Sequence, residues 1–132
     1  MKLSIIMPIY NENKTLLKIY NKVKNVNLED IKKEIIIVDD ASKDNSWEII
    51  QNIKDKNIIK VKHKKNKGKS CAIKTALNYV TGDYIIIQDG DLEYNPEEYK
   101  KLLKYINDYD VIYGSRLLGK IRGFNVPLHY IG

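Results

Sequence analysis

Short apolar runs rich in Ile and Val recur along this chain and alternate with segments in which apolar residues follow a helical period. Five such runs lie at residues 3–7, 35–38, 58–61, 84–87 and 111–113. Continuous β-branched runs of this length are typical of strands that are buried on both faces of a parallel sheet. Strands that alternate with helices predict the order βαβαβαβαβ, an open α/β sheet with flanking helices.

Local signals place two of the helix starts. Asn95 is a suitable cap, Pro96 suits a first turn, and acidic residues follow, so we expect a helix over residues 96–107. Residues 44–46 precede a second helix, and the sequence leaves open which of the three is its cap. In the stretch 117–132, Gly119, Gly123 and Pro127 interrupt any regular period, so no element is predicted there.

Size and composition predict a single folded domain over residues 1–132. The one cysteine, Cys71, excludes an internal disulfide and agrees with a reducing compartment. No apolar run approaches the roughly 18 residues of a membrane span, and the start of the chain lacks the features of a signal peptide. We therefore expect a cytoplasmic location, and contact with the inner face of the membrane is an open alternative.

The net charge of +6 is partly concentrated in residues 60–67, which carry five lysines and a histidine. This run favours contact with phosphates or with an anionic membrane surface. The alternative is an ordinary solvated strand end and loop. Binding to nucleic acid is not predicted, because no aromatic stacking platform and no helix-turn-helix pattern accompanies the charge.

The acidic residues that follow the predicted strands are the first candidates for function, because ligands of open α/β sheets bind beyond the carboxyl ends of the strands. Asp89 and Asp91 flank Gly90 directly after a buried strand, and this spacing lets both carboxylates face one divalent ion such as Mg²⁺. Glu93, two residues further on, is a candidate for a third oxygen ligand. The alternative is a solvated turn before the next helix.

Two further strand ends carry candidate residues for binding a nucleoside. Asp39 and Asp40 end a buried strand, and one of them is suited to accept a hydrogen bond from a nucleobase. Capping of the following turn is the alternative for both. Tyr10 and Glu12 follow the first strand, where an aromatic ring can stack on a base and a carboxylate can hold a ribose. For Glu12 the alternative is that it begins the next helix.

Basic residues at two other positions are candidates for binding phosphate. Lys67 and Lys69 lie where residues 66–70 open a helix, although neither a complete phosphate loop nor a dinucleotide fingerprint is present. Arg116 follows the last predicted strand, and its planar guanidinium suits a phosphate or pyrophosphate. The alternative for Arg116 is a surface side chain on an edge loop.

Taken together, these segments resemble the family 2 glycosyltransferases in order and approximate spacing. The resemblance is carried by SIIMPIYNE (4–12), IVDDASKD (37–44), NKGK (66–69), DGDLE (89–93) and GSR (114–116). It covers essentially the whole chain and is nearest to the dolichyl phosphate mannosyltransferase and bacterial polyprenyl phosphate glycosyltransferase branch. It implies a GT-A fold, a Rossmann-like open and mostly parallel sheet with flanking helices.

The resemblance also implies roles for individual residues. Asp91 and Arg116 are the expected catalytic residues, and Asp89, Asp91 and Glu93 the expected ligands of Mg²⁺ or Mn²⁺. Glu93 stands where this branch commonly has Gln. The residues expected to bind the nucleotide sugar are Pro8, Tyr10, Glu12, Asp40, Lys69, Asp89 and Gly90. The first four of these would line the base and ribose pocket.

The reaction implied is transfer of a sugar, with inversion, from a GDP- or UDP-sugar to a polyprenyl phosphate. Two departures bear on it. The second arginine of the mannosyltransferases is absent near His129 and Tyr130, and the chain ends at Gly132, where the family continues into an acceptor-binding region. We therefore expect a C-terminally shortened chain that is prone to self-association.

The alternative function is that of a remnant that binds the donor without transferring the sugar. A phosphate-receiver domain is disfavoured, because its acid pair follows the first strand.

Overall fold

The computed structural model describes residues 1–90, 96–103, 111–112 and 129–131. Its strands form one sheet in the order β3-β2-β1-β4-β6-β5, and every neighbouring pair is parallel. The strands are β1 (Lys2–Ile9), β2 (Lys32–Asp39), β3 (Ile58–Lys62), β4 (Tyr84–Ile87), β5 (Val111–Ile112) and β6 (His129–Ile131). The helices are α1 (Leu16–Asn25), α2 (Ser46–Gln51), α3 (Lys69–Leu77), the 3-10 turn η1 (Pro96–Glu98) and α4 (Tyr99–Leu103).

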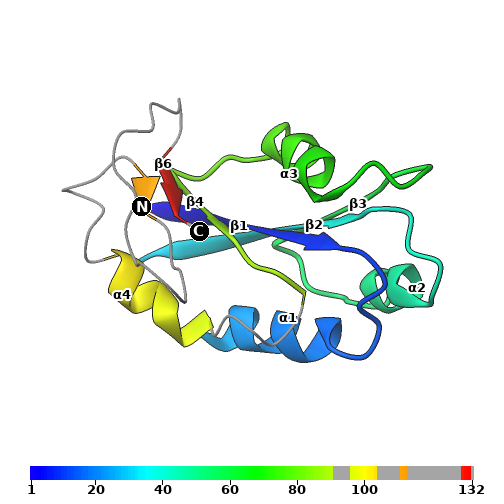
Figure 1. The fold of residues 1–132 in the computed structure, drawn as a ribbon. Helices are drawn as coiled ribbons and strands as arrows, with labels where there is room; N and C mark the ends of the chain where they lie inside the picture. Colours follow the sequence, from blue (N-terminus) through cyan, green and yellow to red (C-terminus); the bar gives the residue numbers. More distant parts are fainter. Residues whose placement is uncertain (91–95, 104–110, 113–128, 132) are drawn as a thin grey trace.

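The helices cover both faces of the sheet, as the alternating pattern predicts. Helix α3 lies on one face, and α1, α2 and α4 lie on the other (Figure 1). Each face has its own core of buried side chains, and successive residues of β2 divide between them, since side chains alternate along a strand. Ile35 and Ile37 belong to the core beside α1, whereas Ile36 and Val38 belong to the core beside α3. The same alternation decides where the two acids that follow Val38 point.

The predicted strands are confirmed, and one strand was missed. Each of the five predicted runs coincides with a strand or with part of one, although Tyr113 lies outside the described residues. The prediction that residues 117–132 hold no element is wrong, because β6 inserts between β4 and β5. Of its three residues only Tyr130 and Ile131 are apolar, a run shorter than any of the five predicted ones, and Gly119, Gly123 and Pro127 precede it, so the sequence pattern did not indicate a strand.

The predicted helix starts are refined at two places. The segment that begins at Pro96 opens as a 3-10 turn and continues as α4 to Leu103, which is common at the first turn of a helix. Asn95 and residues 104–107 lie outside the described residues. At α2 the N-cap position is Asn45, but the side-chain bond comes from Asp44, whose Oδ1 accepts the Ser46 amide at 2.9 Å.

Candidate functional site

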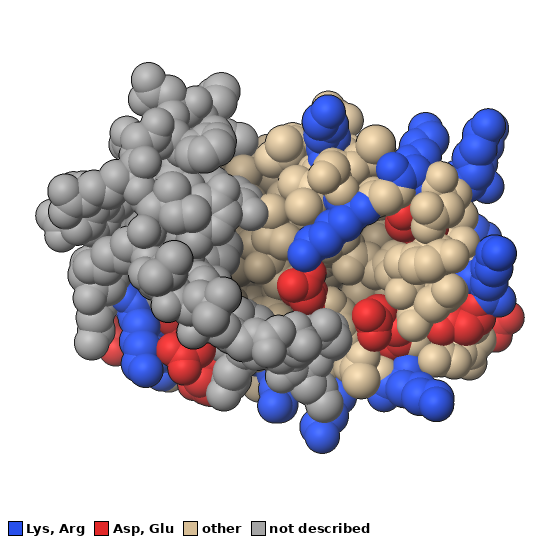
Figure 2. Space-filling model, viewed as in Figure 1, with Lys and Arg blue, Asp and Glu red and all other residues tan. Residues whose placement is uncertain are grey.

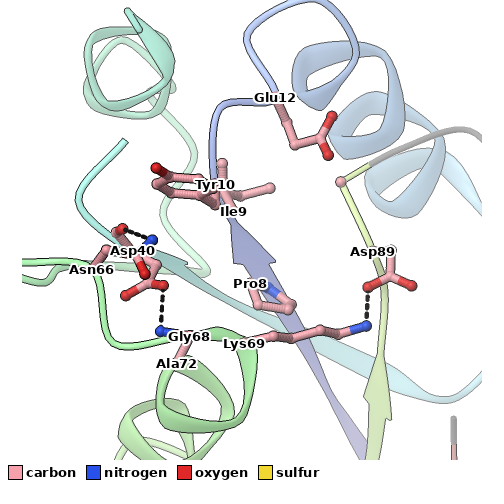
Figure 3. A pocket seen from close by; sticks show the side chains of 11 residues that line it. Pro8, Ile9, Tyr10, Glu12, Asp40, Asn66, Gly68, Lys69, Ala72 and Asp89 are labelled. Atoms are coloured by element: carbon pink, nitrogen blue, oxygen red, sulfur yellow. Dashed lines mark hydrogen bonds and ion pairs between the residues drawn. The ribbon is translucent and has the colours of Figure 1, made fainter. Parts of the chain in front are cut away.

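A pocket of about 350 Å³ opens beyond the carboxyl ends of β1, β2 and β4, where ligands of open α/β sheets bind. Figure 3 shows its walls: the end of β1 and the loop after it, the loop after β2, the first turns of α3, and the loop after β4. The lining residues are Pro8, Ile9, Tyr10, Glu12, Asp40, Asn66, Gly68, Lys69, Ala72, Asp89 and Gly90.

The structure brings together all seven residues that were predicted to bind a nucleotide sugar, because each of them lines this one pocket. Three predicted residues, Asp91, Glu93 and Arg116, lie outside the described residues. Sequence reasoning did not single out Ile9 or Ala72, since apolar residues of a strand end and a helix give no signal beyond core packing.

Asp40 forms one wall of the pocket and is only 3% exposed. Its Oδ1 accepts hydrogen bonds from His63 Nδ1 at 2.8 Å and from the Lys67 amide at 2.9 Å, and its Oδ2 accepts the Gly68 amide at 2.8 Å. Burial would raise the pKa of Asp40, but these bonds and the nearby His63 outweigh it and hold the pKa below its usual value. A carboxylate has about four acceptor positions, so this ionised group can accept one more donor.

Asp39 points to the opposite face of the sheet and has a different role. Its Oδ2 accepts the Ser42 amide at 3.1 Å, the turn-capping bond that was considered for both acids. Asp39 is fully buried, and its Oδ1 has no hydrogen-bond partner among the described residues. Asp39 therefore shapes the loop after β2, whereas Asp40 faces the pocket.

The loop that carries Tyr10 and Glu12 is locked against the loop after β2. The Asn11 amide donates to Ser42 Oγ at 2.9 Å, and Asn11 Oδ1 accepts the Lys43 amide at 2.7 Å. Asn11 adopts a left-handed φ of 52°, a conformation that asparagine tolerates better than most residues. These bonds hold the ring of Tyr10, which is 41% exposed, at the rim of the pocket.

Glu12 is not the first residue of the next helix, because α1 begins at Leu16. The Glu12 carbonyl instead accepts the amides of Thr15 and Leu16 at 3.1 and 2.9 Å, which closes the turn before α1. Its amide donates to Ser46 Oγ at 3.1 Å. The Glu12 side chain lines the pocket, and its Oε2 lies within hydrogen-bond distance of Thr15 Oγ1, at 3.2 Å.

Gly90 brings the loop after β4 close to the end of β1. A Cβ at this position would lie 2.6 Å from Ile9 Cδ1 and 3.3 Å from Glu12 Cγ, closer than side chains pack. The Gly90 carbonyl accepts a hydrogen bond from Thr15 Oγ1 at 2.6 Å, which ties the loop to the residue before α1. Only glycine allows this approach without a shift of its neighbours.

Lys69 and Asp89 form an ion pair on the side of the pocket opposite Tyr10 (Figure 3). Their side chains are 56% and 44% exposed, so solvent screens the attraction and the pair is easily separated. The pair shows that the Asp89 carboxylate is placed to face a cation. Among the described residues no group of three or more His, Cys, Asp or Glu side chains forms a metal cluster.

Lysines gather beside this pocket. Lys64, Lys65 and Lys67 are exposed on the loop between β3 and α3. Figure 2 shows basic side chains along both the α3 side and the α1 side of the molecule, and acidic side chains near the hollow in this face. The three loop lysines, together with Lys69 in the pocket lining, favour an anionic ligand at the α3 side of the pocket.

Solved glycosyltransferases share this architecture. The mannosyltransferase PcManGT from Pyrobaculum calidifontis, in complex with GDP-Man and Mn²⁺, matches with a TM-score of 0.73 and 25% identity over 84% of this chain and 34% of that chain. TarS of S. aureus, in complex with UDP-GlcNAc, matches with a TM-score of 0.70 and 25% identity over 96% of this chain and 37% of that chain. The described sheet and helices are thus those of the GT-A glycosyltransferase fold, as predicted.

Relatives in sequence identify the family. The family model "Glycosyl transferase family 2" matches residues 4–131. A dolichol-phosphate mannosyltransferase of Pyrococcus furiosus is 36% identical over 94% of this chain and 36% of that protein. An undecaprenyl-phosphate 4-deoxy-4-formamido-L-arabinose transferase of Proteus mirabilis is 34% identical over 87% of this chain and 36% of that protein.

The chain therefore belongs to glycosyl transferase family 2, which confirms the resemblance found in its sequence. It spans about a third of the length of these two relatives, 36% of each. None of the helices among the described residues combines the length and the hydrophobicity that crossing a bilayer requires.

Proposed function

We propose that this chain binds a nucleoside diphosphate sugar in the pocket beyond β1, β2 and β4, and that it provides the donor half of an inverting transfer to a polyprenyl phosphate. The observation that carries the proposal is the division of the pocket. Tyr10 and Asp40 lie at one side, and the Lys69–Asp89 ion pair lies at the other. A nucleoside diphosphate has the same division, with an aromatic base at one end and two phosphates at the other.

The base and ribose are assigned to the side lined by Pro8, Tyr10, Glu12 and Asp40. The half-exposed ring of Tyr10 offers an aromatic face for stacking. Asp40 offers its last acceptor position to an N–H group of the base. Uracil and guanine both present a ring N–H on the edge used for base pairing, whereas the ring nitrogen of adenine on that edge is an acceptor, which agrees with a UDP- or GDP-sugar as donor.

The diphosphate is assigned to the start of α3 and to the loop after β4. Amides of a first helical turn have no partner within the helix and attract phosphate. Because Asp40 already binds the Lys67 and Gly68 amides, this role falls to the first turn of α3 and to the Lys69 ammonium. Arg116 is proposed to contact a phosphate of the donor or of the lipid.

Asp89 is proposed to hold Mg²⁺ or Mn²⁺, together with Asp91 and Glu93. Oxygen ligands suit both ions, and the ion pair with Lys69 supports a cation beside Asp89. When bound, such an ion neutralises the charge that develops on the leaving diphosphate. PcManGT, a structural neighbour, was solved with GDP-Man and Mn²⁺, which supports both the donor class and the ion.

A polyprenyl phosphate acceptor is supported by the names of the two sequence relatives, which act on dolichol phosphate and undecaprenyl phosphate. A phosphate is already an anionic nucleophile at neutral pH, so its attack on the sugar needs less help from a general base than attack by a hydroxyl group. With a lipid acceptor, the transfer reaction would take place at the inner face of a membrane.

A second candidate is donor binding without transfer by these 132 residues. It is motivated by the match to only 36% of each relative, because the remaining part of those proteins lies outside the matched residues. Positioning of the acceptor supplies several kcal/mol of a transfer barrier, so its loss would abolish turnover while binding persisted.

One assay separates the two candidates. Transfer of a radiolabelled sugar to a short polyprenyl phosphate is measured for the 132-residue chain and for the same chain extended by the corresponding region of the Pyrococcus furiosus relative. We expect turnover from the extended protein and little from the chain alone. Comparable turnover would place the acceptor site within these residues, and no turnover from either would contradict the proposed transfer.

A further inference from the structure

His63 lies directly behind the pocket, although it does not line it. It follows β3, is 7% exposed, and its backbone amide donates to the Asp39 carbonyl at 2.8 Å. Its Nδ1 is 2.8 Å from Asp40 Oδ1, and its Nε2 is 2.8 Å from the hydroxyl of Thr75 in α3. The imidazole therefore joins α3 to the carboxylate that forms the pocket wall.

The direction of these hydrogen bonds follows from the partners of Asp40. Both Asp40 oxygens accept backbone amides, of Lys67 and of Gly68, so the carboxylate acts as an acceptor. The hydrogen between Asp40 and His63 must then be on Nδ1. His63 therefore donates from Nδ1 to Asp40, and its Nε2 is hydrogen-bonded to the Thr75 hydroxyl, so a chain of two hydrogen bonds runs from α3 through the imidazole to the carboxylate.

We propose that His63 is a positioning residue for the nucleotide: held by Thr75, it fixes the Asp40 carboxylate so that one acceptor position remains directed to the nucleobase. The inference rests on the function proposed above. The two amides hold Asp40 on the side of α3, and among the described residues His63 is the side chain that holds it from behind. Burying a polar pair costs free energy that an apolar pair at this position would avoid.

The proposal is tested by comparing two ligands that differ in the base. Dissociation constants are measured calorimetrically for whichever of UDP and GDP binds the unmodified chain more tightly, and for inorganic pyrophosphate. His63→Leu should weaken nucleotide binding by about tenfold, the equivalent of one good hydrogen bond, and leave pyrophosphate binding unchanged. His63→Asn places an amide N–H near the position of Nδ1 and should restore most of the loss.

Ser4→Ala is the matched control. Ser4 is fully buried and donates to Glu34 Oε2 at 2.7 Å, near the amino ends of β1 and β2 and away from the pocket. Its loss should lower stability without changing the affinity for either ligand. Equal losses of nucleotide and pyrophosphate affinity in His63→Leu would mean a merely structural role and would overturn the proposal.

A double-mutant cycle tests whether His63 acts through Asp40. In an Asp40→Asn background, His63→Leu should cause no further loss of nucleotide affinity, whereas an independent full loss would overturn the proposal. Should His63→Leu not fold, Thr75→Val removes the hydroxyl at the far end and keeps the side-chain volume. We expect that variant to weaken nucleotide binding by about twofold or more, and unchanged binding would count against the proposal.

The hydrogen on Nδ1 can be observed without any ligand. The chain has two histidines, so ¹⁵N spectra of the imidazoles are assigned by comparison with His63→Asn. A His63 ring without hydrogen on Nδ1 would overturn the inference. If the unmodified chain binds neither nucleotide, the proposed function fails and this inference falls with it. Normal binding by His63→Leu would overturn this inference alone.

Discussion

The Lys69 ammonium and the Asp89 carboxylate meet on one side of the pocket, from the first residue of α3 to the second residue beyond β4. Figure 3 shows the two side chains reaching toward each other between these elements. A pair of half-exposed charges stabilises the fold by at most about 1 kcal/mol. It does, however, place a cation where a divalent ion is proposed, so Lys69 and that ion compete for one carboxylate.

Replacing Lys69 should therefore change two affinities in opposite directions. Lys69→Ala frees Asp89, so Mn²⁺ binding in the absence of nucleotide, measured by electron paramagnetic resonance, should tighten by about two- to fivefold. Binding of UDP or GDP without metal should weaken, because a positive charge near the diphosphate is lost. Lys74→Ala, an exposed lysine on the same helix, is the control. A decrease or no change in Mn²⁺ affinity would contradict the competition.

Asp91 is predicted from the sequence to complete the metal site. Asp91→Ala should abolish the Mn²⁺ dependence of nucleotide affinity, because a hard divalent ion loses one of its carboxylate ligands. Circular dichroism verifies that the fold is retained. Metal dependence equal to that of the unmodified chain would remove Asp91 from the site.

The two neighbouring acids after β2 should respond differently to the same change. Asp40→Asn replaces an acceptor oxygen with a donor, so nucleotide binding should weaken by about 1–3 kcal/mol, the effect of an unpaired buried group. Asp39→Asn should alter affinity less, because its side chain caps the turn at Ser42 and does not line the pocket. Calorimetric titration at matched protein stability checks both, and a larger loss in Asp39→Asn would reverse the assignment.

Gly90 is predicted to be required for the close contact between the loop after β4 and β1. In Gly90→Ala the new Cβ would lie 2.6 Å from Ile9 Cδ1, so the free energy of unfolding in urea should fall by about 1–3 kcal/mol. Ile9→Val removes that methyl group. The double variant should recover part of the loss, and strictly additive effects would contradict the steric explanation.

Glu34 should make stability depend on pH in the acid range. Burial raises its pKa, but hydrogen bonds from Ser4 and Thr81 and the nearby Lys2 outweigh burial, and the pKa lies below the ordinary value of 4.5. Because the pKa is lowered in the folded state, this stabilisation is fully present above 4.5 and is lost as the pH falls below it. Glu34→Gln should flatten that part of the unfolding profile, measured by urea denaturation at several pH values. An equally steep profile in the variant would exclude Glu34 as the cause.

The sequence allowed the prediction of those strands and pocket residues that a local residue pattern marks. The strands were visible because β-branched runs mark buried parallel strands, and the pocket residues were visible because they directly follow those strands. His63 was not identified, because it lies in a lysine-rich run and its partners Asp40 and Thr75 are 23 and 12 residues away. The Lys69–Asp89 pair likewise depends on the spatial approach of α3 and β4, which no local pattern encodes.

Calorimetric titration shows whether the chain binds a sugar nucleotide and whether that binding depends on a divalent ion. The folded 132-residue chain is titrated with UDP- and GDP-sugars, with and without Mn²⁺, and with an ADP-sugar as control. We expect saturable one-to-one binding of a UDP- or GDP-sugar that tightens when Mn²⁺ is added, with weaker binding of the ADP-sugar. No saturable binding of any of the three, with or without Mn²⁺, would contradict this expectation.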